Sequence, residues 1–158
     1  MENLQNPAPA RTEDVQYLKV VEMIHCYAES IGLDRNSAYY PEKKVWLWRK
    51  GSVQIEVKIQ RLTFADGYFR DILRVFSPIM DVPSTSNLLG FYRRLLELND
   101  EKLGIKLCLV PNSPKVWASF DRDITGIDFN ELRTFIGDFE FWADKLDEEL
   151  KGQFPHLN

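Results

Sequence analysis

One alternating stretch decides the fold: Val53-Gln54-Ile55-Glu56-Val57-Lys58-Ile59-Gln60. Successive side chains of a β-strand point to opposite faces, so this pattern predicts a strand with one apolar and one polar face. On its amino-terminal side, Lys50-Gly51 predicts a tight turn that follows a strand at residues 45–48. A two-residue turn there pairs Trp48 with Val53. The sequence therefore predicts a hairpin at the start of an antiparallel sheet.

Beyond residue 60 the apolar phase slips, because Leu62 and Phe64 take positions that were polar before. Asp66-Gly67 predicts a second hairpin turn, which leads into a strand at residues 68–77. One extra residue at Gln60-Arg61 would restore the pairing of apolar residues, so we predict a β-bulge there. The residues then expected on one core face are Trp46, Trp48, Val53, Ile55, Val57, Ile59, Leu73 and Val75.

Helices and a second hairpin complete the predicted domain. Apolar residues spaced three and four apart predict helices from residue 15 to 31, from 88 to 100, and from the capping residue Asp128 onward. A further hairpin is expected from strands at 105–110 and 115–120. The order α-β-β-β-α-β-β-α predicts an α+β fold, with a five-stranded antiparallel sheet and helices mainly on one face. We expect tails at residues 1–12 and 151–158 around one domain spanning 13–150.

Composition excludes several classes of function. The chain has 158 residues, with 24 acidic and 20 basic side chains and a net charge of −4. This balance argues against a nucleic-acid-binding protein. No apolar run approaches the roughly 18 residues of a membrane helix, and the first residues lack the pattern of a secretory signal. We therefore expect a cytoplasmic protein without membrane insertion.

The sequence carries no recognisable catalytic motif or cofactor-binding motif. Its two histidines belong to no metal or triad pattern, so no catalytic residue, metal site or cofactor is predicted. Residues 121–128 begin like a calcium loop, but Leu132 stands where the bidentate Glu is needed. Cys26 and Cys108 are expected to be buried, inert thiols. One alternative remains, a small enzyme that uses His25 with nearby carboxylates.

Several apolar residues fall on the face opposite the predicted core. The residues concerned are Val45, Leu47, Cys108, Val110 and Trp117. A sheet face exposed to water is normally polar. Either the first helix or a loop covers this patch, or it binds a partner chain with Trp117 as the aromatic anchor.

The element order and several short motifs resemble the YbjN-type family and the class I type III secretion chaperones. The matching segments are Trp46-Leu47-Trp48-Arg49-Lys50-Gly51-Ser52, Ser77-Pro78, Val82-Pro83, Leu88-Leu89, Leu95-Leu96-Glu97-Leu98-Asn99, Val116-Trp117 and Trp142-Ala143-Asp144. The resemblance spans residues 15–150.

This resemblance implies a bacterial homodimer without cofactor or active site, which holds extended client segments through apolar patches and strand addition. It places the dimer interface around the second long helix, at residues such as Phe91, Tyr92 and Leu95. The leading hypothesis is therefore a non-enzymatic, chaperone-like adaptor that binds a client protein or peptide segment. The alternative is a dimeric regulatory protein without peptide clients.

Overall fold

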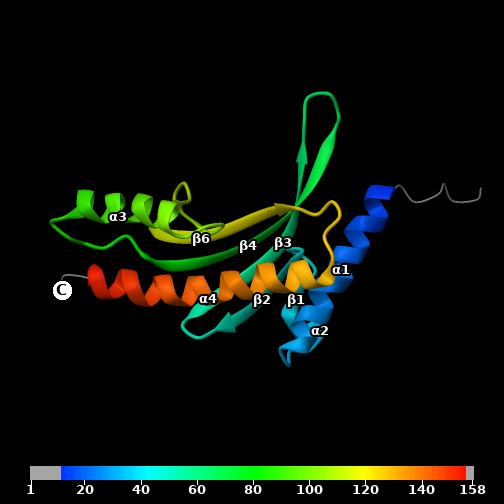
Figure 1. Ribbon diagram of the computed structural model, residues 1–158, viewed down its shortest axis with the longest axis horizontal. Coiled ribbons are helices and arrows are strands. Elements are labelled where there is room, and N and C mark those ends of the chain that lie inside the picture. The colour runs from blue at the N-terminus through cyan, green and yellow to red at the C-terminus, as the bar shows by residue number, and fades with distance from the viewer. Residues whose placement is uncertain (1–11, 156–158) are drawn as a thin grey trace, which may run out of the picture.

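The computed structural model describes residues 12–155, which form one α+β unit around a single antiparallel sheet (Figure 1). The elements are α1 (Thr12–Ser30), α2 (Arg35–Ala38), β1 (Tyr39–Tyr40), β2 (Val45–Lys50), β3 (Val53–Thr63), β4 (Phe69–Asp81), α3 (Leu88–Glu101), β5 (Lys106–Leu109), β6 (Lys115–Asp123) and α4 (Phe129–Gln153). The strand order is β1-β2-β3-β4-β6-β5. The antiparallel α+β class is as predicted.

The sheet has six strands, so the expectation of five was wrong. The additional strand is β1, which pairs with β2 through Tyr39 and Tyr40. It follows the short helix α2, whose first amides donate to the Asp34 side chain. Two strand residues are too few to show an alternating pattern, and four helical residues are too few to show a helical one.

The predicted tails differ from the structure at the carboxyl end. Helix α4 continues to Gln153, so residues 151–153 belong to the helix, and the Phe154 ring packs edge-on against Phe91. The predicted amino-terminal tail lies outside the described residues except for Thr12, which begins α1.

The turn between β2 and β3 is shifted from the predicted one. Trp48 pairs with Ile55 rather than Val53, so the turn residues are Gly51 and Ser52. Gly51 has φ +55°, the positive value that a type II′ hairpin turn requires at its first central residue. Because the shift is two residues, each side chain stays on its predicted face.

No bulge interrupts β3 at Gln60-Arg61, so that prediction was wrong. Ile59 does pair with Leu73, as predicted, but the register is continuous from Glu56 to Thr63. The extra residue lies in the turn instead, where Phe64 N–H donates to Tyr68 O and Gly67 has φ +81°. This is the three-residue hairpin loop in which a left-handed glycine forms the bulge. The observed irregularity of β4 lies farther on, between Pro78 and Met80.

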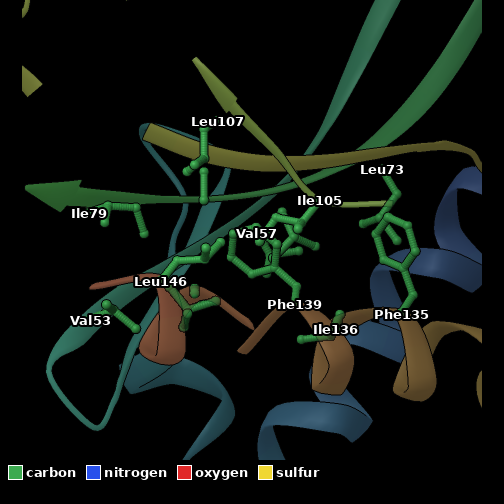
Figure 2. Close-up of a cluster of buried hydrophobic side chains, with 14 of the residues drawn as sticks. Val53, Val57, Leu73, Ile79, Ile105, Leu107, Phe135, Ile136, Phe139 and Leu146 are labelled. Atoms are coloured by element: carbon green, nitrogen blue, oxygen red, sulfur yellow. The ribbon is translucent and has the colours of Figure 1, made fainter. Parts of the chain in front are cut away.

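The core lies between one face of the sheet and the three long helices. Helix α4 contributes Phe135, Ile136, Phe139 and Leu146, which point toward Val57 and Leu73 of the sheet (Figure 2). Helices α1 and α3 add Ile24, Phe91 and Leu98 to the same cluster. All of the residues predicted for the core face belong to this cluster or pack against it.

Polar contacts, one of them fully buried, fix the β2–β3 hairpin on α4. The Trp48 indole Nε1 donates to the carboxylate of Glu140, at 2.7 Å, and both residues are buried. Burial and the Glu140 carboxylate raise the pKa of Tyr27, which packs beside Trp48. The Ser52 amide donates to Asp144 and its hydroxyl to Asp147. Since unpaired buried carboxylates are costly, these donors hold the hairpin in one position.

Gly51 and Gly67 provide a matched pair of substitutions. Alanine at either position must adopt a positive φ, and this strain lowers the free energy of unfolding by about 1–2 kcal/mol. A Cβ at Gly51 would also collide with the Asp144 carboxylate, whereas a Cβ at Gly67 meets open space. We expect Gly51→Ala to lower the free energy of unfolding by at least about 1 kcal/mol more than Gly67→Ala. Denaturant titration measures both values, and equal losses would contradict the proposed role of the Asp144 contact.

Candidate protein-binding surface

The side of the sheet that faces away from the core cluster is here called the open face. Its apolar side chains include Leu47, Ile72, Phe76, Cys108 and Trp117, and its charged ones include Glu56, Lys58, Arg74, Lys106 and Asp121. None of these apolar residues belongs to the core cluster, and all are half-buried. The helices that build the core therefore leave these residues uncovered.

A shallow depression of about 390 Å³ lies on the open face. Its lining comprises Lys58, Arg74, Phe76, Cys108, Leu109, Val110, Pro111, Trp117 and Ser119. These residues come from β3, β4, β6 and the β5–β6 hairpin, so the depression spans four neighbouring strands of the sheet. Its combination of aromatic, aliphatic and cationic side chains is typical of a surface that binds another chain.

The structure brings three of the five predicted patch residues into this depression: Cys108, Val110 and Trp117. Leu47 is half-buried on the open face but outside the depression. Val45 is only 6% exposed, because it lies between its strand partners Tyr40 and Lys58. The proposed role of the set in partner binding remains a prediction, and Val45 is too covered to contribute a large contact.

Trp117 is held in a defined orientation. Its Nε1 donates to the Ser113 hydroxyl at 3.3 Å, and its ring centroid lies 5.9 Å from that of Phe76. Sequence reasoning did not identify Phe76, which completes this aromatic pair. The sequence did contain an indication of it, because Phe76 is an apolar residue on the side of the third predicted strand that faces away from the core. A pre-oriented aromatic pair loses little conformational entropy when a ligand binds.

The charges on the open face are only partly paired. Asp121 accepts from Arg74 at 2.7 Å and from Lys106 at 2.5 Å. Although burial raises it, these two hydrogen bonds hold the pKa of Asp121 below its usual range. The Lys58 ammonium lies 5.1 Å from the Phe76 ring centroid. Among residues 12–155, no carboxylate is within ion-pairing distance of Lys58.

The outer edge of β5 is closed to strand addition at its centre. Leu107 N–H donates to the Asn99 side chain at 2.6 Å, and the Asn99 amide donates back to Leu107 O at 3.2 Å. Helix α3 thus satisfies the backbone groups that a further strand would need. A ligand therefore meets the open face more readily than this edge.

The dimer residues predicted from the resemblance occupy different environments. Phe91 and Leu95 are buried in the chain's own core, and Tyr92 is partly exposed. The outward side of α3 instead presents Leu89 and Leu96, which are 82% and 71% exposed. Leu103 follows at the same seven-residue spacing and is 91% exposed. Sequence reasoning missed this leucine row because it assigned every leucine of the helix to one stripe.

His25 is held by aromatic contacts. Its Nδ1 accepts from the Trp46 indole at 3.3 Å, and its ring packs edge-on against Tyr39. Burial, and then the charge of Arg35, lower the pKa of His25 below its ordinary value. Because its Nδ1 already accepts a hydrogen bond, the geometry offers no support for the alternative of a His25-based enzyme.

The acidic residues of the calcium-like segment have structural partners. Asp121 is paired as described, Asp123 accepts from the Thr125 amide, and Asp128 forms the predicted capping box with Glu131. Among the described residues, no group of three or more His, Cys, Asp or Glu side chains could hold a metal ion. Cys26 and Cys108 are not joined in a disulfide, and both are half-buried rather than buried as predicted. No helix within residues 12–155 is long and apolar enough to span a membrane.

The lowered pKa of His25 predicts a pH-dependent stability. Its folded-state pKa lies below the unfolded value of about 6.5, so the unfolded chain takes up the proton first as the pH falls. We expect the free energy of unfolding to decrease between about pH 7.5 and pH 5.5. His25→Asn keeps an acceptor for Trp46 without a titrating group and should flatten this dependence. An equal slope in both proteins would assign the effect elsewhere.

Comparison with solved structures finds chains that align with most of this one. A chain in the crystal structure of the ExsC-ExsE complex aligns with a TM-score of 0.58 and 15% sequence identity, covering 84% of this chain and 94% of that one. YbjN from E. coli aligns with a TM-score of 0.49 and 9% identity, covering 82% of this chain and 92% of that one. No protein-family model and no curated protein matches the sequence.

The chain has a type III secretion chaperone-like fold. The resemblance predicted from the sequence is therefore confirmed at the level of the fold. At 15% identity the likeness to the ExsC-ExsE chain shows the fold alone, and it transfers no binding residue. Neither neighbour is described as an enzyme.

Proposed function

We propose that this protein is a non-enzymatic adaptor that binds a segment of a client protein on its open face, in the cytoplasm. The observation that carries the proposal is the depression around Trp117, which no helix of the described chain covers. A chain of the same fold occurs in a complex between two proteins, ExsC and ExsE. That pairing supports protein binding as the use of this fold.

The capping of β5 by Asn99 favours side-chain binding over strand addition. A client segment that lies across the open face can place apolar side chains against the paired rings of Phe76 and Trp117 without needing the sheet edge. Exposed aromatic residues are common anchors of such interfaces because they bury much area with few rotatable bonds.

Trp117→Ala tests this function, with Trp142→Ala as its matched control. Trp142 is also half-buried, but it lies on α4, on the other side of the sheet. We expect a client retained from cell lysate by the wild type to be lost with Trp117→Ala and kept with Trp142→Ala. Chemical cross-linking with mass spectrometry should place that client on β4 and β6.

The stability of Trp117→Ala separates a binding role from a core role. Because Trp117 is half-buried, we expect a cost below about 3 kcal/mol, the lower limit for deleting a buried Trp. A larger loss would make Trp117 a structural residue. A client that binds all three proteins equally would also contradict the proposed site.

We also propose that two copies associate through a leucine row formed by Leu89 and Leu96 of α3 and by Leu103 just beyond it. Leu89 and Leu96 lie seven residues apart on the outward side of α3, and Leu103 follows just past the end of the helix, so strongly exposed leucines extend along this side. Arg93 and Glu97 lie beside this row as an ion pair. In an antiparallel helix pair the two signs of charge meet across the symmetry axis, so the surface is self-complementary.

Leu96→Glu tests the dimer. Sedimentation equilibrium should show a dimer for the wild type and a monomer for this variant, because two charged side chains would then face each other across the interface. The control is Leu18→Glu, which changes an exposed leucine on α1 and should remain dimeric. A wild-type protein that stays monomeric at all concentrations would reject this assembly without affecting the client site.

A further inference from the structure

The depression on the open face is cationic in a chain that is acidic overall. Lys58 and Arg74 are the only charged residues in its lining, which contains no carboxylate, while the whole chain has a net charge of −4. Arg74 donates to Asp121 through Nε and Nη2, and its other guanidinium N–H groups remain available as donors. The Lys58 ammonium is in contact with the Phe76 ring and has no carboxylate partner in the described chain. A bound anion would therefore give Lys58 the ionic partner that the described chain does not supply.

The floor of the same depression contains a buried hydroxyl without a partner. Ser119 is 4% exposed, and no group in the described residues hydrogen-bonds to its Oγ. Its neighbours across the sheet are Phe76 and Lys106. Buried polar groups are almost always paired, so an unpaired hydroxyl that lines a depression indicates a ligand that completes it.

Resting on the proposed function, we propose the chemistry of the bound segment. It is an extended stretch of a partner protein in which an aromatic or large aliphatic residue lies next to an aspartate or glutamate. The apolar side chain packs onto the paired rings of Phe76 and Trp117. The carboxylate pairs with Lys58 and Arg74, and a polar group of the segment reaches the Ser119 hydroxyl.

The apolar and charged parts of this site depend on each other. Side-chain packing over Phe76 excludes water from Lys58, which strengthens its attraction for a carboxylate. An acidic segment without an apolar residue leaves the depression hydrated, and an apolar segment with lysine or arginine places like charges together. The site therefore selects the combination rather than either property alone.

Selection from a phage-displayed library of random peptides tests this preference directly. We expect the wild type to enrich peptides that pair an aromatic or aliphatic residue with an adjacent acid. A fluorescein-labelled peptide of the enriched sequence is then titrated against variants, with fluorescence anisotropy as the readout. Lys58→Glu should weaken its binding by about tenfold or more, while the matched control Lys145→Glu, on α4, should leave it unchanged.

Ser119→Ala separates the ligand contact from stability. Because the hydroxyl is unpaired, its removal should preserve or raise the melting temperature of the protein. The same change should weaken binding of the peptide. Enriched peptides without acids, or equal binding to Lys58→Glu, would overturn this inference and leave a peptide-binding function standing. Failure to enrich any peptide that needs Trp117 would reject both.

Discussion

The packing of α4 against one face of the sheet is the constraint on which the rest of the structure depends. Its apolar stripe meets Val57, Leu73 and Val75, and α1 and α3 fill the space on either side of it. Since all three long helices are engaged in this single core, the described chain contains no helix to cover the opposite face. The same helix also carries Glu140, Asp144 and Asp147, whose carboxylates fix the first hairpin. Helix α4 therefore fixes the first hairpin and covers one face of the sheet, while the opposite face stays exposed.

The open face combines order with accessibility. Cross-strand ion pairs hold the arginine and lysine side chains around Asp121, and the aromatic pair of Phe76 and Trp117 is fixed by neighbouring contacts. The edge strand β5 is closed by Asn99. A surface of this kind binds through side chains placed in advance rather than through extension of the sheet, which keeps the entropic cost of binding small. These properties fit the proposed recognition of a segment of another chain.

Residues whose environment is set by local periodicity were the ones that the sequence could predict. The alternation from Val53 to Ile59 was enough to assign the core face, and the cap at Asp128 marked the start of α4. The turn at Gly51 was misplaced because its position depends on Asp144 and Asp147, more than 90 residues away. Likewise, β1 depends on pairing with β2, which two residues cannot reveal.

In the candidate site, too, local periodicity predicted some features, whereas others depended on the tertiary structure. Alternation correctly put Leu47, Cys108 and Trp117 away from the core, because strand geometry alone decides their side. The contribution of Phe76 and Lys58 required the strand order β3-β4-β6-β5, which brings four strands to one depression. The burial of Phe91 and Leu95 depends on how α3 rotates toward β5, which periodicity does not define.

We propose that ligands bind on the open face and not on the helical side of the sheet. The four tryptophans give four indole N–H signals in a ¹H–¹⁵N correlation spectrum, one of them from Trp117 on the open face. Titration with a purified client segment should shift the Trp117 signal strongly. The signal of Trp48, which donates to buried Glu140, should stay in place. Shifts of Trp142 or of the α3 amides, with Trp117 unchanged, would contradict binding on the open face.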